Sequence, residues 1–170
     1  MNTQYDVVVI GAGSGGLTSA VGFSKVGKKV LLVEREHMGG ECTNTGCVPS
    51  KALLHAAKKS MTASDAFNYV RNTIDGILAE ETPETFQNMG IDVVMGEAIF
   101  AGKNSVTVDD VTYTFRTAVI ATGSSPRMLD IDALDEKHIL TNQNIFELKD
   151  VPKKLLIIGG GPIGMEMAQA

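Results

Sequence analysis

The chain has 170 residues, 44% hydrophobic and 21% charged, the balance of a soluble globular protein with room for one ordinary domain and the start of another. The net charge is −5 and the 15 Lys and Arg residues are scattered, so the basic patch of a nucleic-acid-binding protein is missing. No apolar run approaches the roughly 20 residues that span a bilayer, and the polar start MNTQYD is unlike a signal peptide. We therefore expect a cytoplasmic protein with neither nucleic-acid nor membrane partners.

The first predicted elements form one strand–turn–helix–strand unit. Residues 5–10 (YDVVVI) are apolar and β-branched, which is typical of a strand buried on both faces of a parallel sheet. Residues 11–16 fit G-x-G-x-x-G, a helix is expected over 17–26, and a second strand over 29–33 leads into Glu34. Gly11 suits the tight turn, Gly13 the close approach of a pyrophosphate and Gly16 the packing of helix on strand. An acidic residue about 20 positions further on suits the ribose hydroxyls, so this unit predicts dinucleotide binding.

The remaining predicted elements follow in chain order: a loop over 37–45, a helix that Pro49 opens and that runs to Lys59, a helix over 64–81, a strand over 91–95, a meander over 97–115 with a turn at Asp109–Asp110, a strand over 118–121, an irregular connection over 126–150 and a strand over 154–158 that enters GGGPIGMEMAQA. This order indicates an α/β fold of Rossmann type, a parallel sheet plus a β-meander, over residues 1–150. Residues 151–170 are expected to be the first strand and helix start of a second dinucleotide-binding domain.

The only cysteines are Cys42 and Cys47, in C-x4-C spacing. Such a pair can close a small, strained ring whose disulfide is easily reduced. We expect a helix to start directly after Cys47, where the helix dipole favours a thiolate. The spacing alone leaves open a metal half-site, which would need further ligands such as the three histidines, or two unrelated buried thiols.

The string GGECTNTGCVPSK, residues 39–51, resembles the active-site signature of the class I pyridine-nucleotide–disulfide oxidoreductases. Three further motifs stand in the order found in that family: the amino-terminal glycine motif, ATGSSP at 121–126 and GGGPIGME at 159–166. The wording around Cys42 and the string ETPETFQNMGIDVVMGEAIF resemble the dihydrolipoamide dehydrogenase and mercuric reductase branch most.

The resemblance implies FAD in the first unit and NAD or NADP at the second glycine motif. Cys47 would face the flavin, Cys42 would face the substrate, and Lys51 would sit against the flavin, paired with Glu166. The implied catalytic residues are Cys42, Cys47, Lys51 and Glu166, with no metal site. The implied cofactor-binding residues are Gly11, Gly13, Ser14, Gly16, Glu34, Arg35, Gly40, Cys42, Lys51, Ala98, Ala121, Thr122 and Gly123 for FAD, and Gly159, Gly161 and Gly164 for the nicotinamide nucleotide.

The implied activity passes electrons between NAD(P)H, FAD and the Cys42–Cys47 disulfide to a small-molecule or protein-bound disulfide or dithiol. In the family, a His–Glu acid–base pair and the dimer interface come from a carboxy-terminal domain, so we expect these 170 residues to be inactive alone and the full-length protein to be a homodimer. A non-catalytic FAD-binding or redox-sensing module is the alternative.

Overall fold

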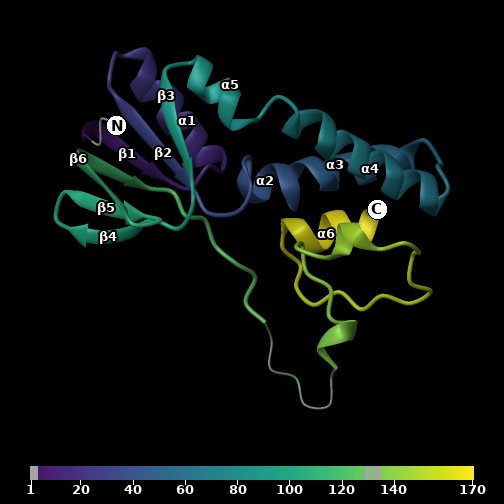
Figure 1. The fold of residues 1–170 in the computed structure, drawn as a ribbon. Helices are drawn as coiled ribbons and strands as arrows, with labels where there is room; N and C mark the ends of the chain where they lie inside the picture. Colours follow the sequence, from purple (N-terminus) through teal and green to yellow (C-terminus); the bar gives the residue numbers. More distant parts are fainter. Residues whose placement is uncertain (1–3, 129–130, 132–134) are drawn as a thin grey trace. The chain divides into compact units, whose positions relative to one another are not determined.

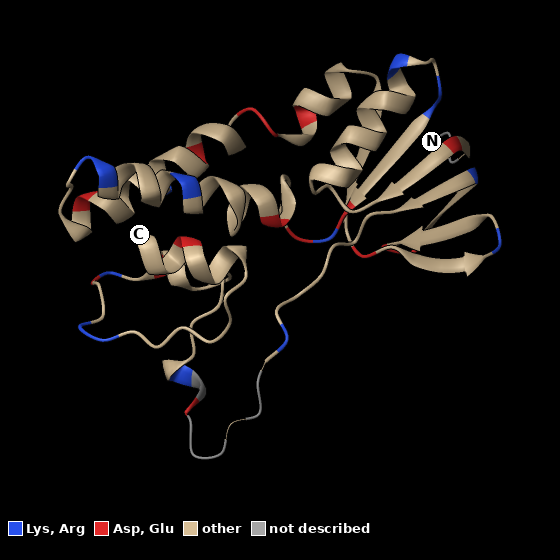
Figure 2. Ribbon diagram, turned by 180° about the vertical axis from the view of Figure 1, so that it is seen from behind, with Lys and Arg blue, Asp and Glu red and all other residues tan. Residues whose placement is uncertain are grey.

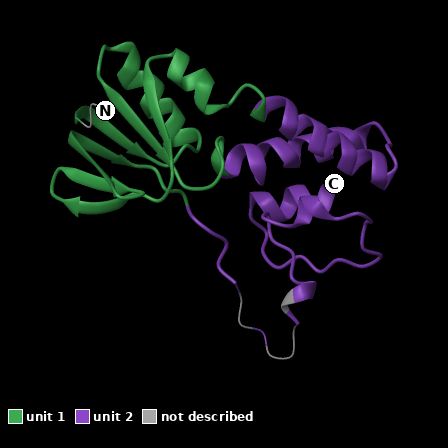
Figure 3. Cartoon of the chain, in the orientation of Figure 1, with its two compact units in different colours: residues 1–40, 78–123 green, residues 41–77, 124–170 purple. Residues whose placement is uncertain are grey.

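The computed structural model describes residues 4–128, 131 and 135–170 (Figure 1). Contacts within the chain divide it into two units, residues 1–40 with 78–123 and residues 41–77 with 124–170 (Figure 3). Each unit has its own elements and its own apolar core. The expected domains over residues 1–150 and 151–170 stay a prediction.

The first unit is built on a six-stranded sheet in the order β3-β2-β1-β6-β5-β4. Strands β1 (Gln4–Ile10), β2 (Val30–Glu34), β3 (Ile91–Met95) and β6 (Val111–Ile120) run parallel, whereas β4 (Ile99–Gly102) and β5 (Ser105–Val108) add antiparallel pairs. Helices α1 (Ser14–Lys25) and α5 (Pro83–Asn88) pack on the parallel strands. The predicted α/β fold, a mostly parallel sheet with a β-meander, is therefore confirmed.

Strand β1 is buried on both faces, as its uninterrupted apolar sequence predicts. Successive strand side chains point to opposite faces of a sheet. Accordingly, Val7 and Val9 pack with Leu17 of α1, whereas Val8 and Ile10 pack with residues of the meander. Both layers hold the carboxyl end of β1 in place, and this is where the glycine turn begins.

Two features of the first unit differ from the sequence-based expectation, and one agrees. The strand expected over 118–121 is the end of β6, a single strand that pairs with β5 in its first half and with β1 further along. Helix α5 was not predicted, although Thr82 accepts a hydrogen bond from the Thr85 amide and Pro83 occupies the first turn, two ordinary signals of a helix start. The expected turn at 109–110 is confirmed, because both residues have positive φ, 44° and 65°.

The second unit is helical in its described part. It holds most of α2 (Gly40–Asn44), with α3 (Cys47–Lys58), α4 (Ala63–Leu78), α6 (Pro162–Gln169) and the 3-10 turns η1 (Glu136–His138) and η2 (Ile145–Glu147). Its core is small and contains Ala52 of α3, Val70 of α4 and Phe146 of η2. Phe146 therefore joins the connection between the two glycine motifs to the helices that follow the cysteines.

Three expectations for the second unit are corrected. The loop expected over 37–45 contains α2, which is too short to show a helical period. Helix α3 begins at Cys47 with Gly46 as its N-cap, so Pro49 lies inside the first turn and does not open the helix. Residues 154–158 form no strand, and Leu156 and Ile158 are 84% and 60% exposed. A strand needs neighbouring strands for its hydrogen bonds, and the described part of this unit offers none.

Charges and hydropathy of the described residues give two further observations. Figure 2 shows basic and acidic residues interspersed along each unit. Where the chain is described, none of its helices combines the length and the apolar character needed to cross a membrane.

Candidate active site

The turn between β1 and α1 brings three strand ends and the start of a helix together. Gly11 has φ +101°, and a Cβ there would collide with the carbonyl oxygen of Ala121. A Cβ on Gly16 would collide with the carbonyl oxygen of Gly11. Both glycines are thus required by the packing of the protein itself, as the motif predicts.

Gly13 differs from its two partners in the motif. Its backbone is extended, with φ −76° and ψ −177°, which any residue adopts. The nearest atom to a Cβ built on it is the Cα of Gly40, at an ordinary 3.8 Å. Neither conformation nor internal packing therefore calls for glycine, whereas the close approach of a ligand would. Helix α1 begins here with no side-chain cap and no acidic residue in its first turn, so its first N–H groups, from Ser14 on, suit a pyrophosphate.

Glu34 lies at the end of β2, directly beside this turn. Its carboxylate accepts hydrogen bonds from the backbone N–H of Ala12, at 2.6 Å, and of Glu36, at 2.7 Å. Each carboxylate oxygen keeps a further lone pair, so the side chain can still accept a hydroxyl hydrogen bond. This arrangement fits the predicted contact with a ribose. The neighbouring Arg35 is 63% exposed and pairs with Glu36 and Glu97, and its role stays a prediction.

Other predicted cofactor residues gather at the same end of the sheet. Gly40 has φ +57°, and a Cβ there would stand 2.5 Å from the Cα of Gly13. The amide of Ala121 donates to Ile10, at 2.8 Å, and leads into the exposed Thr122 and Gly123. Ala98 follows Gly96, whose amide donates to the backbone carbonyl of Glu34 at 2.7 Å. The carboxyl ends of parallel strands are where α/β sheets bind their ligands, so this cluster fits FAD.

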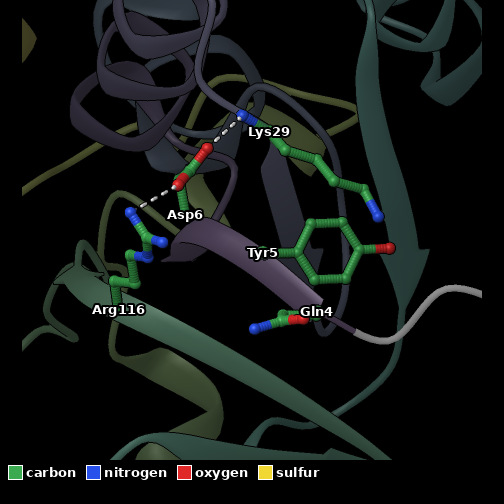
Figure 4. Close-up of a pocket in the computed structure, with 5 residues that line it drawn as sticks. All are labelled: Gln4, Tyr5, Asp6, Lys29 and Arg116. Carbon is green, nitrogen blue, oxygen red and sulfur yellow. Dashed lines mark hydrogen bonds and ion pairs between the residues drawn. The ribbon is translucent and has the colours of Figure 1, made fainter.

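A cavity of about 230 Å³ lies near the opposite, amino-terminal end of the parallel strands (Figure 4). Asp6 accepts from the amide of Lys29 at 3.1 Å and lies 3.7 Å from Arg116, while the ammonium of Lys29 stands over the ring of Tyr5. Asp6 thus pairs with Arg116, and the cavity lies at the end of the strands opposite to the glycine turn that carries the predicted cofactor residues.

The two cysteines lie in the second unit as thiols, not as a disulfide. Cys42, in α2, is half-buried, and Cys47, the first residue of α3, is exposed. A Cβ on Gly46 would stand 2.8 Å from the carbonyl oxygen of Glu41 and 3.3 Å from the Cα of Cys42. Gly46 therefore lets the start of α3 pack against the backbone of Cys42. Sequence reasoning missed this residue, although its place between the cysteines was a signal.

Lys51 and Glu166 form an ion pair, with 2.6 Å between Nζ and Oε1. The hydrogen bond to Glu166 raises the pKa of Lys51, and the two nearby thiols, Cys47 and Cys42, raise it further. The hydrogen bond from Lys51, followed by one from Ser50, lowers the pKa of Glu166. The ammonium is thus kept charged within electrostatic range of both sulfurs.

The second glycine motif repeats the geometry of the first. Gly159 has φ +108°, and a Cβ on Gly164 would collide with the carbonyl oxygen of Gly159. A Cβ on Gly161 would meet no atom within 4 Å. Helix α6 begins directly after Gly161. The predicted nicotinamide-nucleotide contacts of these glycines are consistent with this turn and stay a prediction.

A metal site gains no support from the described residues. In that part of the chain, no group of three His, Cys, Asp or Glu side chains lies close enough to hold a metal ion. His55 instead stacks on Tyr69, with 5.6 Å between the ring centroids.

Comparison with known proteins agrees with this geometry. The Pyridine nucleotide-disulphide oxidoreductase family matches residues 5–170. The chain is 40% identical to a dihydrolipoyl dehydrogenase of Bacillus subtilis (strain 168), over 98% of the chain and 40% of that protein. It is 37% identical to a mercuric reductase of Streptomyces lividans, over 99% of the chain and 40% of that protein.

A solved structure supports the same assignment. The HOCl-induced flavoprotein disulfide reductase RclA from Escherichia coli superposes with a TM-score of 0.88 at 30% identity, over 96% of this chain and 39% of that one. The chain thus spans about 40% of the length of these relatives. Members of the matched family carry FAD and use NAD or NADP. The chain belongs to the pyridine nucleotide-disulphide oxidoreductase family.

Proposed function

We propose that the protein is a flavoprotein disulfide oxidoreductase that takes two electrons from NADH or NADPH and passes them through Cys42 and Cys47 to a disulfide substrate. The carrying observation is the Lys51–Glu166 ion pair. It joins two motifs 115 positions apart and keeps a positive charge near both thiols.

The residues proposed to hold FAD are those of the first glycine turn, with Gly13 for the pyrophosphate and Glu34 for the ribose. The absence of any clash for a Cβ on Gly13 and the spare lone pairs of Glu34 support this proposal. When bound, FAD supplies an acceptor for the hydride of NADH or NADPH, which side chains lack.

The proposed thiol chemistry is a disulfide exchange. Two electrons and two protons convert the Cys42–Cys47 disulfide into two thiols. The Cys42 thiolate attacks the substrate disulfide, forms a mixed disulfide and releases one substrate thiol. The Cys47 thiolate then attacks the sulfur of Cys42, releases the second substrate thiol and restores the disulfide. The reverse sequence oxidises a dithiol substrate.

The order of the two sulfurs rests on the resemblance of the signature. In this chain Cys47 is the more exposed sulfur and Cys42 is half-buried, so exposure alone would suggest the opposite order. Cys47 is the first residue of α3, and this place at the amino-terminal end of a helix suits the sulfur proposed to face the flavin.

Counting thiols during anaerobic reduction tests the proposal. Addition of one equivalent of NADH or NADPH to the oxidised flavoprotein should generate two thiols per chain and a long-wavelength thiolate–flavin absorbance band. Cys42→Ser should retain the band and Cys47→Ser should lose it. Reduction of the flavin with no new thiols would refute the relay and favour a binding or redox-sensing module.

A soft metal ion is a second candidate substrate. The relatives include mercuric reductases, and one similar structure is described as a Cu(II) complex of RclA. Parallel assays of NAD(P)H oxidation with lipoamide and with Hg(II) or Cu(II) distinguish the two substrates.

A further inference from the structure

One contact in the second unit joins the segment before η2 to the residue that precedes Cys42. The side-chain amide of Asn142 donates to the carboxylate of Glu41, with 2.5 Å between Nδ2 and Oε1, across 101 positions of sequence. Glu41 lies within the signature GGECTNTGCVPSK but has no role in the proposed relay, and Asn142 lies outside the motifs of that relay.

Asn142 sits in a segment that is fixed at several points. The amide of Thr141 donates to the side chain of Asn144 at 2.7 Å, and that side chain in turn donates to the carbonyl of Ile139 at 3.2 Å. Just beyond, Phe146 is buried in the core with α3 and α4, only 8% exposed. The amide of Asn142 is therefore presented from an anchored loop.

Glu41 is held on its backbone side as well. Its carbonyl accepts from the amide of Thr45 at 2.9 Å, and Gly46 packs tightly against the same carbonyl. With its side chain held by Asn142, Glu41 is fixed at both ends, and Cys42 is the next residue along α2.

We propose that Asn142 is a positioning residue for Cys42: its amide fixes the Glu41 carboxylate and, through it, the turn that carries the substrate-facing thiol. The hydrogen bond between Asn142 and Glu41 is observed in the structure, and the role of Cys42 as the substrate-facing thiol rests on the proposed function. Without Asn142, the Glu41 carboxylate is free to approach the sulfur of the next residue, and a carboxylate near a thiol disfavours the thiolate, because like charges repel. Lys51, with its partner Glu166, is a further charged group within electrostatic range of Cys42, and Lys51 also lies within range of Cys47.

The test is the pH profile of iodoacetamide alkylation of the reduced, intact protein, with each cysteine followed separately by mass spectrometry. In Asn142→Ala, the apparent pKa of Cys42 should rise and its alkylation near neutral pH should slow by about threefold, which corresponds to half a pKa unit. In Asn142→Asp the slowing should be larger, because two carboxylates then meet. Cys47 should change little in either variant.

Removal of the charge on Glu41 provides the decisive comparison. Glu41→Gln alone should speed alkylation of Cys42, and Asn142→Ala should have no further effect in that background. Gln143→Ala, one position away, should leave both thiols unchanged, since the contact of Gln143 with Thr141 is made by its backbone amide. Asn142→Ala that slows both cysteines equally, or that acts undiminished in the Glu41→Gln background, would overturn the proposal.

These outcomes are independent of electron transfer. Alkylation of the reduced protein needs neither substrate nor NAD(P)H, so the positioning role can fail while the relay holds. Absence of the thiolate–flavin absorbance band when the wild-type protein is reduced would instead refute the relay. If Asn142→Ala does not fold, Glu41→Gln still decides the matter, because an unchanged Cys42 profile in that variant overturns the proposal.

Discussion

Gly13→Ala should separate the binding of FAD from the folding of the protein. The added methyl group meets no protein atom closer than the Cα of Gly40, at 3.8 Å, and the backbone at this position suits alanine. The unfolding free energy without FAD should therefore change by less than about 1 kcal/mol, since alanine reduces the entropy of the unfolded chain but suits the N-cap of α1 less well than glycine.

The loss in FAD affinity follows from the same methyl group. It stands where the pyrophosphate is expected to approach the first N–H groups of α1. A hydrogen bond to a charged group contributes about 1.5–3 kcal/mol, so loss of one such bond weakens binding by roughly 10- to 150-fold.

Gly16→Ala is the matched control, because its methyl group would collide with the backbone carbonyl of Gly11. This change should lower the unfolding free energy by about 1–3 kcal/mol even without FAD. Urea unfolding followed by circular dichroism measures the stability of both variants, and quenching of flavin fluorescence measures their affinity. Gly13→Ala that binds FAD like the wild type, or that unfolds as easily as Gly16→Ala, would refute the reasoning.

Three further changes test other parts of the structure. Lys51→Gln should raise the pKa of Glu166 towards its usual 4.5, since the Lys51 ammonium holds it lower, and carboxyl-carbon NMR can measure this pKa. In the wild type, the stabilisation from the ion pair is present above pH 4.5 and is lost as the pH falls through the lowered pKa of Glu166. Burial and the hydrogen bond to Asp92 raise the pKa of Tyr5 above its usual 10, so wild-type stability should fall above about pH 10 more steeply than that of Tyr5→Phe, in urea unfolding at pH 8 and 11. Thr82→Ala removes the side-chain cap of α5 and should cost about 1 kcal/mol of unfolding free energy, whereas Thr82→Ser should keep it.

Elements with local causes could be predicted from the sequence. The strands β1 and β2 and the helix between them follow from apolar runs and a glycine motif that lie within some 30 residues. The turn at Asp109–Asp110 is equally local, and φ is positive at both residues. Helix α5 also has local start signals, Thr82 as its N-cap and Pro83 in its first turn, although it is only six residues long.

Features with distant causes could not be predicted by pattern alone. Residues 154–158 have the composition of a buried strand, but strand geometry depends on partners that are supplied elsewhere in a protein. The Lys51–Glu166 pair was anticipated only through the family resemblance, since nothing in the spacing links residues 115 positions apart. The contact of Asn142 with Glu41 was invisible, because no local rule connects an amide in an irregular segment to a carboxylate beside Cys42.

The glycine motifs show what the structure adds to a pattern. In the sequence the three glycines of each G-x-G-x-x-G count equally. In the structure, a Cβ on Gly16 would collide with the carbonyl oxygen of Gly11, and a Cβ on Gly164 with that of Gly159. Both contacts lie within the glycine turn, and the second forms although no strand precedes its turn. Gly13 has no such contact within the turn, and the close approach of a cofactor pyrophosphate, as proposed above, would account for a glycine at this position. In such a motif, cofactor binding is therefore expected at the glycine that no contact within the protein requires.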